Sequence, residues 1–244
     1  ALPLGQKSDK NPIQAVDLQW HVISLAQPAH YMVIKGNRFF VENIREELDS
    51  PGEWYYDPPS RQLYFWPPDD QDPTDAVSIP VLDNLIAVQG DSARGAFVSH
   101  VQFRDLDLAE TNESLMLLDH TAECRVTGST FTHCGATAVK LLNGGQHNRI
   151  AGCDIHHVGG LAISLEDTVD WTHQPEGHLA YNVIDNNHVH DVGEGGDAWC
   201  AIGLLPGCGG NASHDNVFSH NLIHDTPRQG IYFNGMANTV EYNH

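Results

Sequence analysis

An asparagine pattern that recurs through the second half of the chain limits its fold more than any other feature. Each copy places an Asn two residues before an apolar residue, which is Ile150, Ile184, Phe218 or Val240. A second column lies three residues after each of these apolar positions and holds Cys153, Asn187, Asn221 and Asn243. Fixed columns separated by variable insertions are typical of a solenoid, in which each coil contacts only its neighbours.

The spacing of the apolar positions gives the length of each coil. Equal intervals separate Ile150 from Ile184 and Ile184 from Phe218, and a shorter interval separates Phe218 from Val240. A weaker copy begins at Val126, one coil before Ile150. Stacked Asn side chains can hydrogen-bond one coil to the next, as in other in-register β stacks. The pattern predicts an all-β protein with a right-handed parallel β-helix.

The first part of the chain, residues 1–92, does not show the repeat. Residues 54–56 and 64–66 are aromatic, and the segments 54–56 and 63–66 flank a Pro- and Ser-containing turn, which predicts a hairpin. We therefore expect a small antiparallel β segment at residues 1–92 that packs on the solenoid, and coils at residues 93–244. The aromatic side chains suit either a sugar-binding platform or a hydrophobic cluster that caps the first coil, and the cluster is preferred.

A second strand is expected in each coil, because apolar residues alternate there with an outward-facing residue. Its copies are residues 115–117, 139–141, 163–165, 202–204 and 231–233. The long insertions, 166–181 and 205–215, follow this strand. Successive insertions on one side of a solenoid usually build a binding cleft.

The charge balance excludes one class of partner. The formal net charge is −20, with only 12 Lys and Arg residues against 32 Asp and Glu residues. Nucleic acid is excluded as a partner, because phosphate binding needs clustered cations. No signal peptide and no apolar run long enough to cross a membrane is present, so no membrane association is predicted.

The cysteines and the chain ends give two further expectations. Cys153 occupies a ladder column and is interpreted as a small buried core residue; Cys200 and Cys208 flank a Gly- and Pro-rich loop and are either bridged or two buried thiols. The chain starts at Ala1 without Met and ends at His244 within a coil. Because a solenoid normally carries a cap over its last coil, we expect further polypeptide of the same protein beyond His244.

Two columns just beyond the second ladder carry the candidate chemistry. One residue after the inward apolar position stands a histidine, His190 or His224, and one residue later an aspartate, Asp191 or Asp225. A shared column places side chains of consecutive coils about 4.8 Å apart. Two carboxylates that close raise the pKa of one of them, which suits an acid and base pair in glycoside hydrolysis. The alternative is a structural one, in which each Asp caps a turn at the corner of the solenoid.

Further candidates break the apolar pattern near the insertions. Glu166 begins the first insertion and is the third catalytic candidate, and Trp171, Trp199 and Asp197 suit a sugar subsite. A solvated loop is the competing interpretation for these residues. Glu166, Asp167, His190 and Asp191 could converge on a metal, but no spacing demands it. We therefore predict no cofactor and no metal site, with Ca²⁺ as the secondary option.

At these residues the chain resembles the carbohydrate-active β-helix enzymes of the pectate-lyase-like superfamily, most closely glycoside hydrolase family 141 and its relatives. The likeness is carried by residues 40–43, 49–55 and 63–68, by 153–160, and by 220–231 with 240–243. The resemblance implies a secreted or periplasmic enzyme that cleaves a plant or algal polysaccharide with paired acidic residues. Similar proteins continue beyond the point where this chain stops, with a further acidic coil motif that we expect to hold part of the catalytic set.

The function predicted from these observations is a glycoside hydrolase acting on a polysaccharide or oligosaccharide. Asp191 and Asp225 are its acid, base or nucleophile candidates. His190 and His224 would position the substrate, the tryptophans would stack on sugar rings, and Arg228 lies beside the candidate face.

Two rival functions remain. A polysaccharide lyase needs Arg, Lys or Ca²⁺ to neutralise a uronate carboxylate, and cations are scarce in the coils. Those present are Arg94, Arg104, Arg125, Lys140, Arg149 and Arg228. A non-catalytic glycan-binding β-helix is the second rival.

Overall fold

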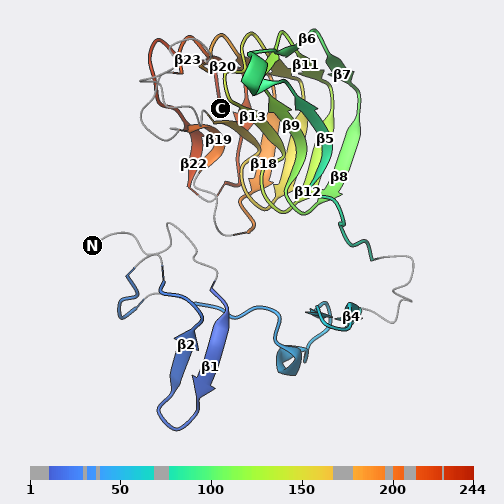
Figure 1. Cartoon of the computed structure of the whole chain (residues 1–244), viewed down its shortest axis with the longest axis vertical. Helices are drawn as coiled ribbons and strands as arrows, with labels where there is room; N and C mark the ends of the chain where they lie inside the picture. Colours follow the sequence, from blue (N-terminus) through green and yellow to red (C-terminus); the bar gives the residue numbers. More distant parts are fainter. Residues whose placement is uncertain are drawn as a thin grey trace. The chain divides into compact units, whose positions relative to one another are not determined.

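The computed structural model describes residues 11–29, 32–36, 39–68, 77–166, 178–195, 200–205, 213–226 and 228–244. Contacts divide the chain into two compact units, of which one ends at Ile79 and the other runs from Pro80 to His244 (Figure 1). Within the described ranges, no helix is long and apolar enough to cross a membrane.

The described residues of the first unit form two antiparallel hairpins. β3 (Trp54–Asp57) pairs with β4 (Gln62–Phe65), and the predicted hairpin is thereby confirmed. The rings of Tyr55 and Tyr64 lie 6.0 Å apart across it. β1 (Ile13–Asp17) and β2 (Val22–Leu25) form a second hairpin that the sequence analysis missed. The packing of this unit on the solenoid stays a prediction.

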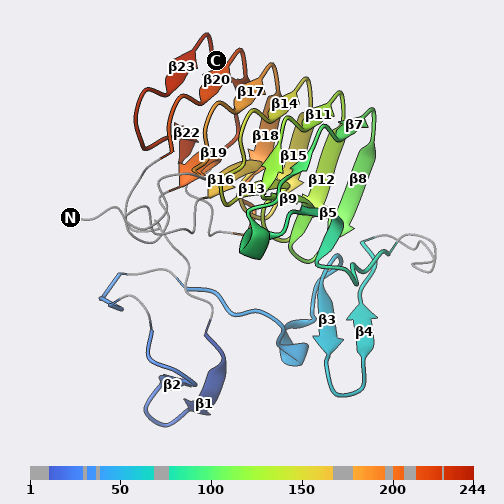
Figure 2. The same ribbon diagram turned by 45° about the horizontal axis from the view of Figure 1, so that its top comes forward.

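The second unit is a parallel β-helix with three sheets, numbered here by their order within a coil (Figure 2). Sheet 1 stacks β7 (Gln102–Arg104), β11 (Arg125–Thr127), β14 (Arg149–Ala151), β17 (Val183–Asp185), β20 (Val217–Ser219) and β23 (Thr239–Glu241). Sheet 2 stacks β8 (Asp107–Thr111), β12 (Thr130–Cys134), β15 (Asp154–Val158), β18 (His188–Val192) and β21 (Leu222–Ile223). Sheet 3 stacks β5 (Asn84–Gln89), β9 (Ser114–Asp119), β13 (Val139–Leu142), β16 (Ile163–Glu166), β19 (Cys200–Leu205) and β22 (Gln229–Tyr232). A further short pair joins β6 (Val98–Ser99) to β10 (Thr121–Ala122).

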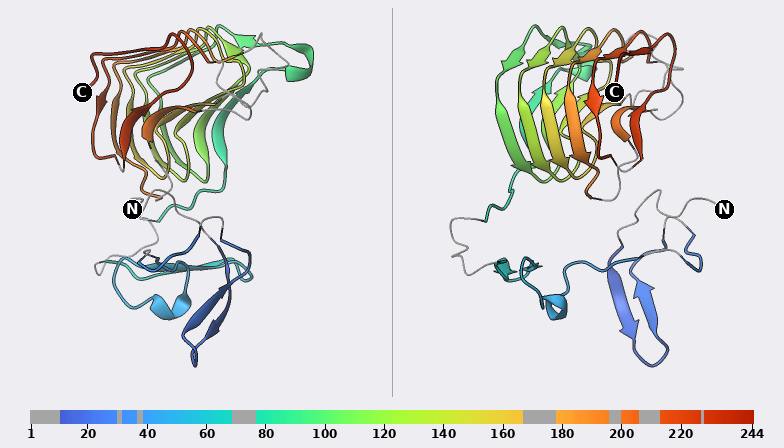
Figure 3. Two further views of the ribbon diagram at one scale, coloured as in Figure 1. Left: turned by 90° about the vertical axis from the view of Figure 1, so that its left-hand side faces the viewer. Right: turned by 180° about the vertical axis from the view of Figure 1, so that it is seen from behind.

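The register of sheets 1 and 2 is the one that the repeat predicts. Ile150 pairs with Ile184 in sheet 1, and Ile155 pairs with Val189 in sheet 2. These inward residues are fully buried, together with Val126, Phe131 and Phe218. The core is therefore a stack of aliphatic and aromatic layers that runs along the solenoid. Figure 3 shows how the coils of the backbone stack one upon the next.

Two asparagine ladders run through the interior of the solenoid. In the first, Oδ1 of Asn182 accepts from the backbone N–H of Asn148 at 3.0 Å and from its Nδ2 at 3.1 Å. Asn182 Nδ2 then donates to the Gly145 carbonyl at 2.8 Å and to Asn216 Oδ1 at 3.0 Å. Each amide thus supplies the acceptor for a buried backbone N–H at a bend and adds a second donor to a carbonyl such as that of Gly145, which also accepts from the N–H of Ala180.

The second ladder repeats these bonds with Asn187, Asn221 and Asn243. A buried cysteine stands at the start of each ladder, because the backbone N–H of Cys124 and that of Cys153 each donate to the first Asn, at 3.0 Å. The prediction that Cys153 is a buried core residue is confirmed. Cys200 is a buried free thiol, and burial raises its pKa to about 12, whereas Cys208 lies outside the described residues.

Two details of sheet 3 differ from the sequence-based alignment. Met116, not Leu115, pairs with Val139, so the first copy of the second strand was placed one residue too early. Leu115, Met116 and Leu118 are all fully buried, and such an apolar run hides the alternation that fixes a register. β5 already pairs with β9, so the parallel sheets begin before residue 93.

Each coil turns its corners through left-handed residues. The corner between sheets 2 and 3 takes one at Glu110, His133, His157, Asp191 and Asp225, with φ between 47° and 69°. Asp, Asn, His and Gly adopt this conformation more readily than other residues. The residue types in this column are therefore favoured by the backbone, before any chemistry is considered.

Just after this corner, glycines let the coils approach closely. A Cβ on Gly159 would lie 2.4 Å from the Gly135 carbonyl oxygen, and one on Gly195 would lie 2.8 Å from that of Gly159. Those contacts are with backbone atoms, which cannot rotate away. The close spacing of the coils beside the histidine column thus depends on glycine having no side chain at these positions.

Replacing Asn182 with Ala is expected to lower the free energy of unfolding by about 1–3 kcal/mol. The change leaves the buried N–H of Asn148 without its acceptor, whereas the carbonyl of Gly145 still accepts from the backbone N–H of Ala180. Urea denaturation followed by circular dichroism measures the effect. Thr239→Ala, at an exposed position of β23, is the control and should cost less than about 0.5 kcal/mol; equal losses in both variants would contradict the structural role of the ladder.

Gly159→Ala is expected to lower the free energy of unfolding by about 1–3 kcal/mol, because the new methyl group overlaps the backbone of the preceding coil. Gly230→Ala is the matched control, since its Cβ would meet Ile223 Cγ2 at an ordinary 3.6 Å. Thermal unfolding of the two variants side by side makes the comparison, and a control that is as unstable as Gly159→Ala would refute this account of coil spacing.

Candidate functional site

The outer face of sheet 2 carries a cluster of histidines. Ile155 and Val189 point into the core, so the residues on either side of them point outward from β15 and β18. Asp154 pairs with His188 and His156 pairs with His190 across the two strands. The face therefore presents two outward columns, of which the sequence analysis used only one.

The predicted stacking of His190 and His224 is confirmed. Their ring centroids lie 5.2 Å apart with an interplanar angle of 12°. His156 extends the stack on the other side, 5.0 Å from His190 at 11°. Burial lowers the pKa of His156, which favours its neutral form. Three coils thus contribute one imidazole each to a continuous column.

Asp191 and Asp225 occupy the left-handed corner directly after this column. The Nδ1–H of His190 donates to Asp191 Oδ2 at 2.8 Å, and that of His224 donates to Asp225 Oδ2 at 2.7 Å. The hydrogen bond from His190 holds the pKa of Asp191 below its ordinary value. The raised pKa expected from a carboxylate pair is thus not found at Asp191. An ionised Asp191 suits a base or a nucleophile, not a general acid.

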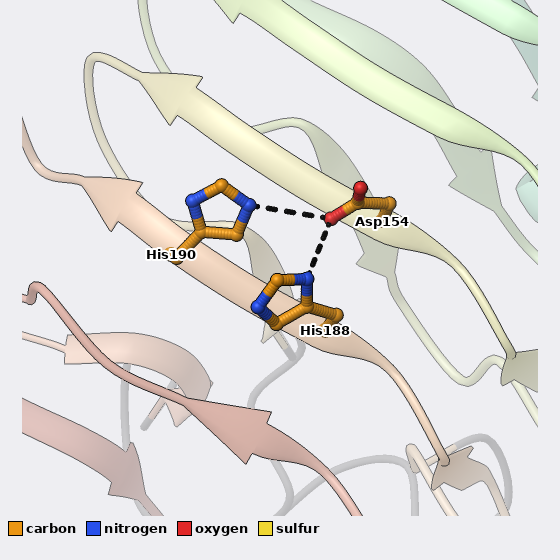
Figure 4. Close-up of side chains that lie close together, drawn as sticks. All are labelled: Asp154, His188 and His190. Atoms are coloured by element: carbon orange, nitrogen blue, oxygen red, sulfur yellow. Dashed lines mark ion pairs between the residues drawn. The ribbon is translucent and has the colours of Figure 1, made fainter.

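A third group, Asp154 with His188 and His190, was missed from the sequence (Figure 4). Asp154 Oδ1 lies 3.1 Å from His188 Nδ1 and 3.4 Å from His190 Nε2. The signal was present, because Asp154 and His188 immediately precede the inward residues Ile155 and Val189. Residues on both sides of an inward position face outward, and only the following side was considered.

A further ion pair lies at the same corner, one coil earlier. His157 Nδ1 lies 2.8 Å from Glu194 Oε1, and this hydrogen bond raises the pKa of His157. The His157 ring also packs 5.3 Å from that of His133. The corner therefore carries imidazoles at His133 and His157 and carboxylates at Asp191 and Asp225 in the two coils that follow.

Glu166 lies on a different sheet from the histidine cluster. It ends β16 in sheet 3, where its carboxylate lies 3.1 Å from Lys140 Nζ and accepts from Ser164 Oγ at 2.9 Å. The ion pair with Lys140 explains why an acidic residue stands at a position that is apolar in the neighbouring coils. The metal grouping that joined Glu166 to His190 and Asp191 included Asp167, which lies outside the described residues.

Of four further residues predicted to bind substrate, one lies among the described residues. Trp171, Asp197 and Trp199 lie outside the described residues, and Arg228 is exposed in the segment that leads into β22. Their roles stay predictions, as does the cleft that the insertions would form. A shallow pocket in the described part of the solenoid is lined by Glu123, Arg125 and His147, apart from the outer face of sheet 2.

Comparisons with known proteins agree with the architecture. The sequence model of the family described as "Right handed beta helix region" matches residues 86–244. A solved structure named "Glycoside hydrolase" superposes with a TM-score of 0.66 at 20% identity, over 78% of this chain and 40% of that one. No curated protein matches the chain. The structural likeness shows the fold, and the match of the family model over more than half of the residues shows that the chain belongs to the right-handed β-helix family.

Proposed function

We propose that the chain belongs to a secreted or periplasmic carbohydrate-active enzyme, and that it is a glycoside hydrolase acting on a polysaccharide at the outer face of sheet 2. The observation that carries the proposal is the stack of His156, His190 and His224, with Asp191 and Asp225 hydrogen-bonded along its edge. A straight column of hydrogen-bonding side chains suits an extended polymer, because successive coils can bind successive sugar units.

The roles follow from the geometry of the corner. Asp191 and Asp225 would act on the glycosidic bond, and His190 and His224 would position the substrate beside them. An ionised Asp191 is suited to activate water or attack the sugar, and a second carboxyl group is needed as the acid. Trp171, Trp199, Asp197 and Arg228 are proposed to extend the subsites, with Glu166 as a more remote acid candidate.

The ion pairs of lysine and arginine side chains in the described residues favour hydrolysis over β-elimination. Lys140 pairs with Glu166 on sheet 3 and Arg149 pairs with Asp185 on sheet 1, so both are already neutralised away from the histidine face. A lyase needs a cation beside the uronate carboxylate. Arg228 is the residue that a lyase mechanism would have to use, which makes its substitution informative if an unsaturated product forms.

Asp191→Asn and Asp225→Asn are each expected to reduce kcat by about 10²–10⁴-fold, the usual contribution of general acid or base catalysis. Whole protein is incubated with a panel of plant and algal polysaccharides, and new reducing ends are measured together with the ultraviolet absorbance of unsaturated products. Asp215→Asn is the matched control. Asp215 accepts from the Nδ1–H of His214 at 2.7 Å and is left-handed at another corner, away from the histidine stack.

Each result of this assay has a definite meaning. Reducing ends without absorbance, lost in the two variants and kept in the control, would support hydrolysis at this face. Absorbance from unsaturated products would replace the hydrolase with a lyase. Binding of a glycan without turnover, unchanged by Asp191→Asn and Asp225→Asn, would make the chain a glycan-binding β-helix.

A further inference from the structure

The arrangement of protons around Asp154 indicates a function for the cluster that the proposed hydrolase does not require. His190 uses its Nδ1–H to bind Asp191, so its Nε2 carries a lone pair when the ring is neutral. That Nε2 is the atom that faces Asp154 Oδ1 at 3.4 Å. Two groups that both offer electron pairs therefore point at each other.

The same accounting applies to His188. His224 uses its Nδ1–H to bind Asp225, so its Nε2 is an acceptor in the neutral ring. His188 Nε2 lies 3.0 Å from that atom and must supply the proton, which leaves a lone pair on His188 Nδ1. His188 Nδ1 lies 3.1 Å from Asp154 Oδ1. The electron pairs of Asp154 Oδ1, His188 Nδ1 and His190 Nε2, which come from two coils, thus point at one another.

Asp154 Oδ1 itself is shielded from solvent and has no hydrogen-bond partner among the described residues, although both ring nitrogens lie within ion-pair distance. The 3.1 Å separation is short enough for a donor and its acceptor, but neither contact forms a hydrogen bond, and both separations are short enough for lone pairs that share a cation. Bonds of about 2.0–2.2 Å from one metal ion to nitrogen and oxygen ligands at tetrahedral angles place the ligand atoms about 3.3–3.6 Å apart. The 3.4 Å separation from His190 lies in that range, and the 3.1 Å separation from His188 is slightly shorter.

The second coordination shell is also present. Metal-bound histidines usually donate their other N–H to a carboxylate, which fixes the ring and its tautomer. Asp191 accepts the Nδ1–H of His190 directly. His188 instead donates its Nε2–H to His224, which in turn donates its Nδ1–H to Asp225. The carboxylate pair that the sequence suggested as acid and base therefore has a second role, in positioning the two imidazoles.

We propose that Asp154, His188 and His190 form a binding site for a divalent transition-metal ion of the Zn²⁺ type. Two imidazole nitrogens and one carboxylate oxygen suit Zn²⁺ and its neighbours, whereas Ca²⁺ takes six to eight oxygen ligands. The side chains of Asp154 and His188 are 49% and 41% exposed, so the ion keeps positions for water or a ligand. Three protein ligands with an open position are typical of catalytic zinc sites and not of structural ones.

Zinc binding by the whole protein, first stripped with a chelator, tests the site without reference to catalysis. Isothermal titration with ZnCl₂ is expected to give one tight site per chain. Asp154→Ala, His188→Ala and His190→Ala should each weaken it by at least about 10–100-fold, and Asp191→Asn by about 10–100-fold through loss of ring positioning. Excess Ca²⁺ should not displace the zinc.

His220→Ala is the matched control. His220 is an exposed histidine that also faces an aspartate, since its Nδ1 lies 3.1 Å from Asp185 Oδ1. That aspartate is already paired with Arg149, so no cation is needed there. The control should bind zinc as tightly as the unmodified protein. Circular dichroism verifies the fold of each variant, and Co²⁺ absorption bands that Zn²⁺ bleaches report the site in the unmodified protein if a variant fails to fold.

Three results would overturn the proposal. One is the absence of tight zinc binding, which would mean that protonated imidazoles pair with Asp154. Another is zinc binding in the His188 and His190 variants as tight as in the control. The third is displacement of zinc by Ca²⁺. Because no substrate is used, zinc binding without glycan cleavage would count against the hydrolase alone, and cleavage by protein that binds no zinc would count against the metal site alone.

Discussion

The asparagine ladders are the interaction on which the rest of the solenoid depends. Parallel strands satisfy their own backbone groups, but the bends between sheets leave buried N–H groups, such as those of Asn148 and Asn182, that donate to the Asn of the next coil. Asn offers one acceptor and two donor hydrogens in a side chain short enough to fit a bend. Asn182 uses both ends, and so does Asn187 in the second ladder. A rung that slipped by one residue would bury these amides without partners, so the ladders fix the register of every coil.

Fixed register has a consequence for the outer surface. When the inward residues of sheet 2 are locked in columns, the outward residues are locked too, and identical side chains in successive coils must stack. This is how His156, His190 and His224 come to lie in one line although a whole coil of sequence separates each from the next. The glycines beside the corner then bring the coils close. The frame of the solenoid thus sets the positions of these side chains, and hydrogen bonds to Asp191 and Asp225 orient the rings of His190 and His224. A binding site needs rigidity of this kind.

The sequence was sufficient for those features that the repeat determines. The β-helix, the register of sheets 1 and 2 and the stacking of His190 on His224 follow from columns of Asn and apolar residues. β9 was misplaced by one residue, because its apolar run gives no alternation. Asp154 and His188 were missed because an outward column with mixed residue types, Asp then His, does not read as a repeat. Trp171 lies in the insertion 166–181, and Trp199 lies in the stretch just before the strand predicted at 202–204. The repeat fixes no register at either position, so the sequence could name these residues but not place them.

Asp191 shows how backbone and chemistry are joined at this corner. A left-handed conformation there favours Asp, Asn, His or Gly, so a polar residue is expected with no function at all. The carboxylate nonetheless binds the preceding imidazole, not a backbone amide of the kind a turn cap would use. That bond orients His190 with its lone pair toward Asp154. The corner thus supplies the residue type for steric reasons, and its position beside an outward histidine turns it into an orienting group. The same repeat therefore generates the fold and the line of imidazole and carboxylate groups on its surface.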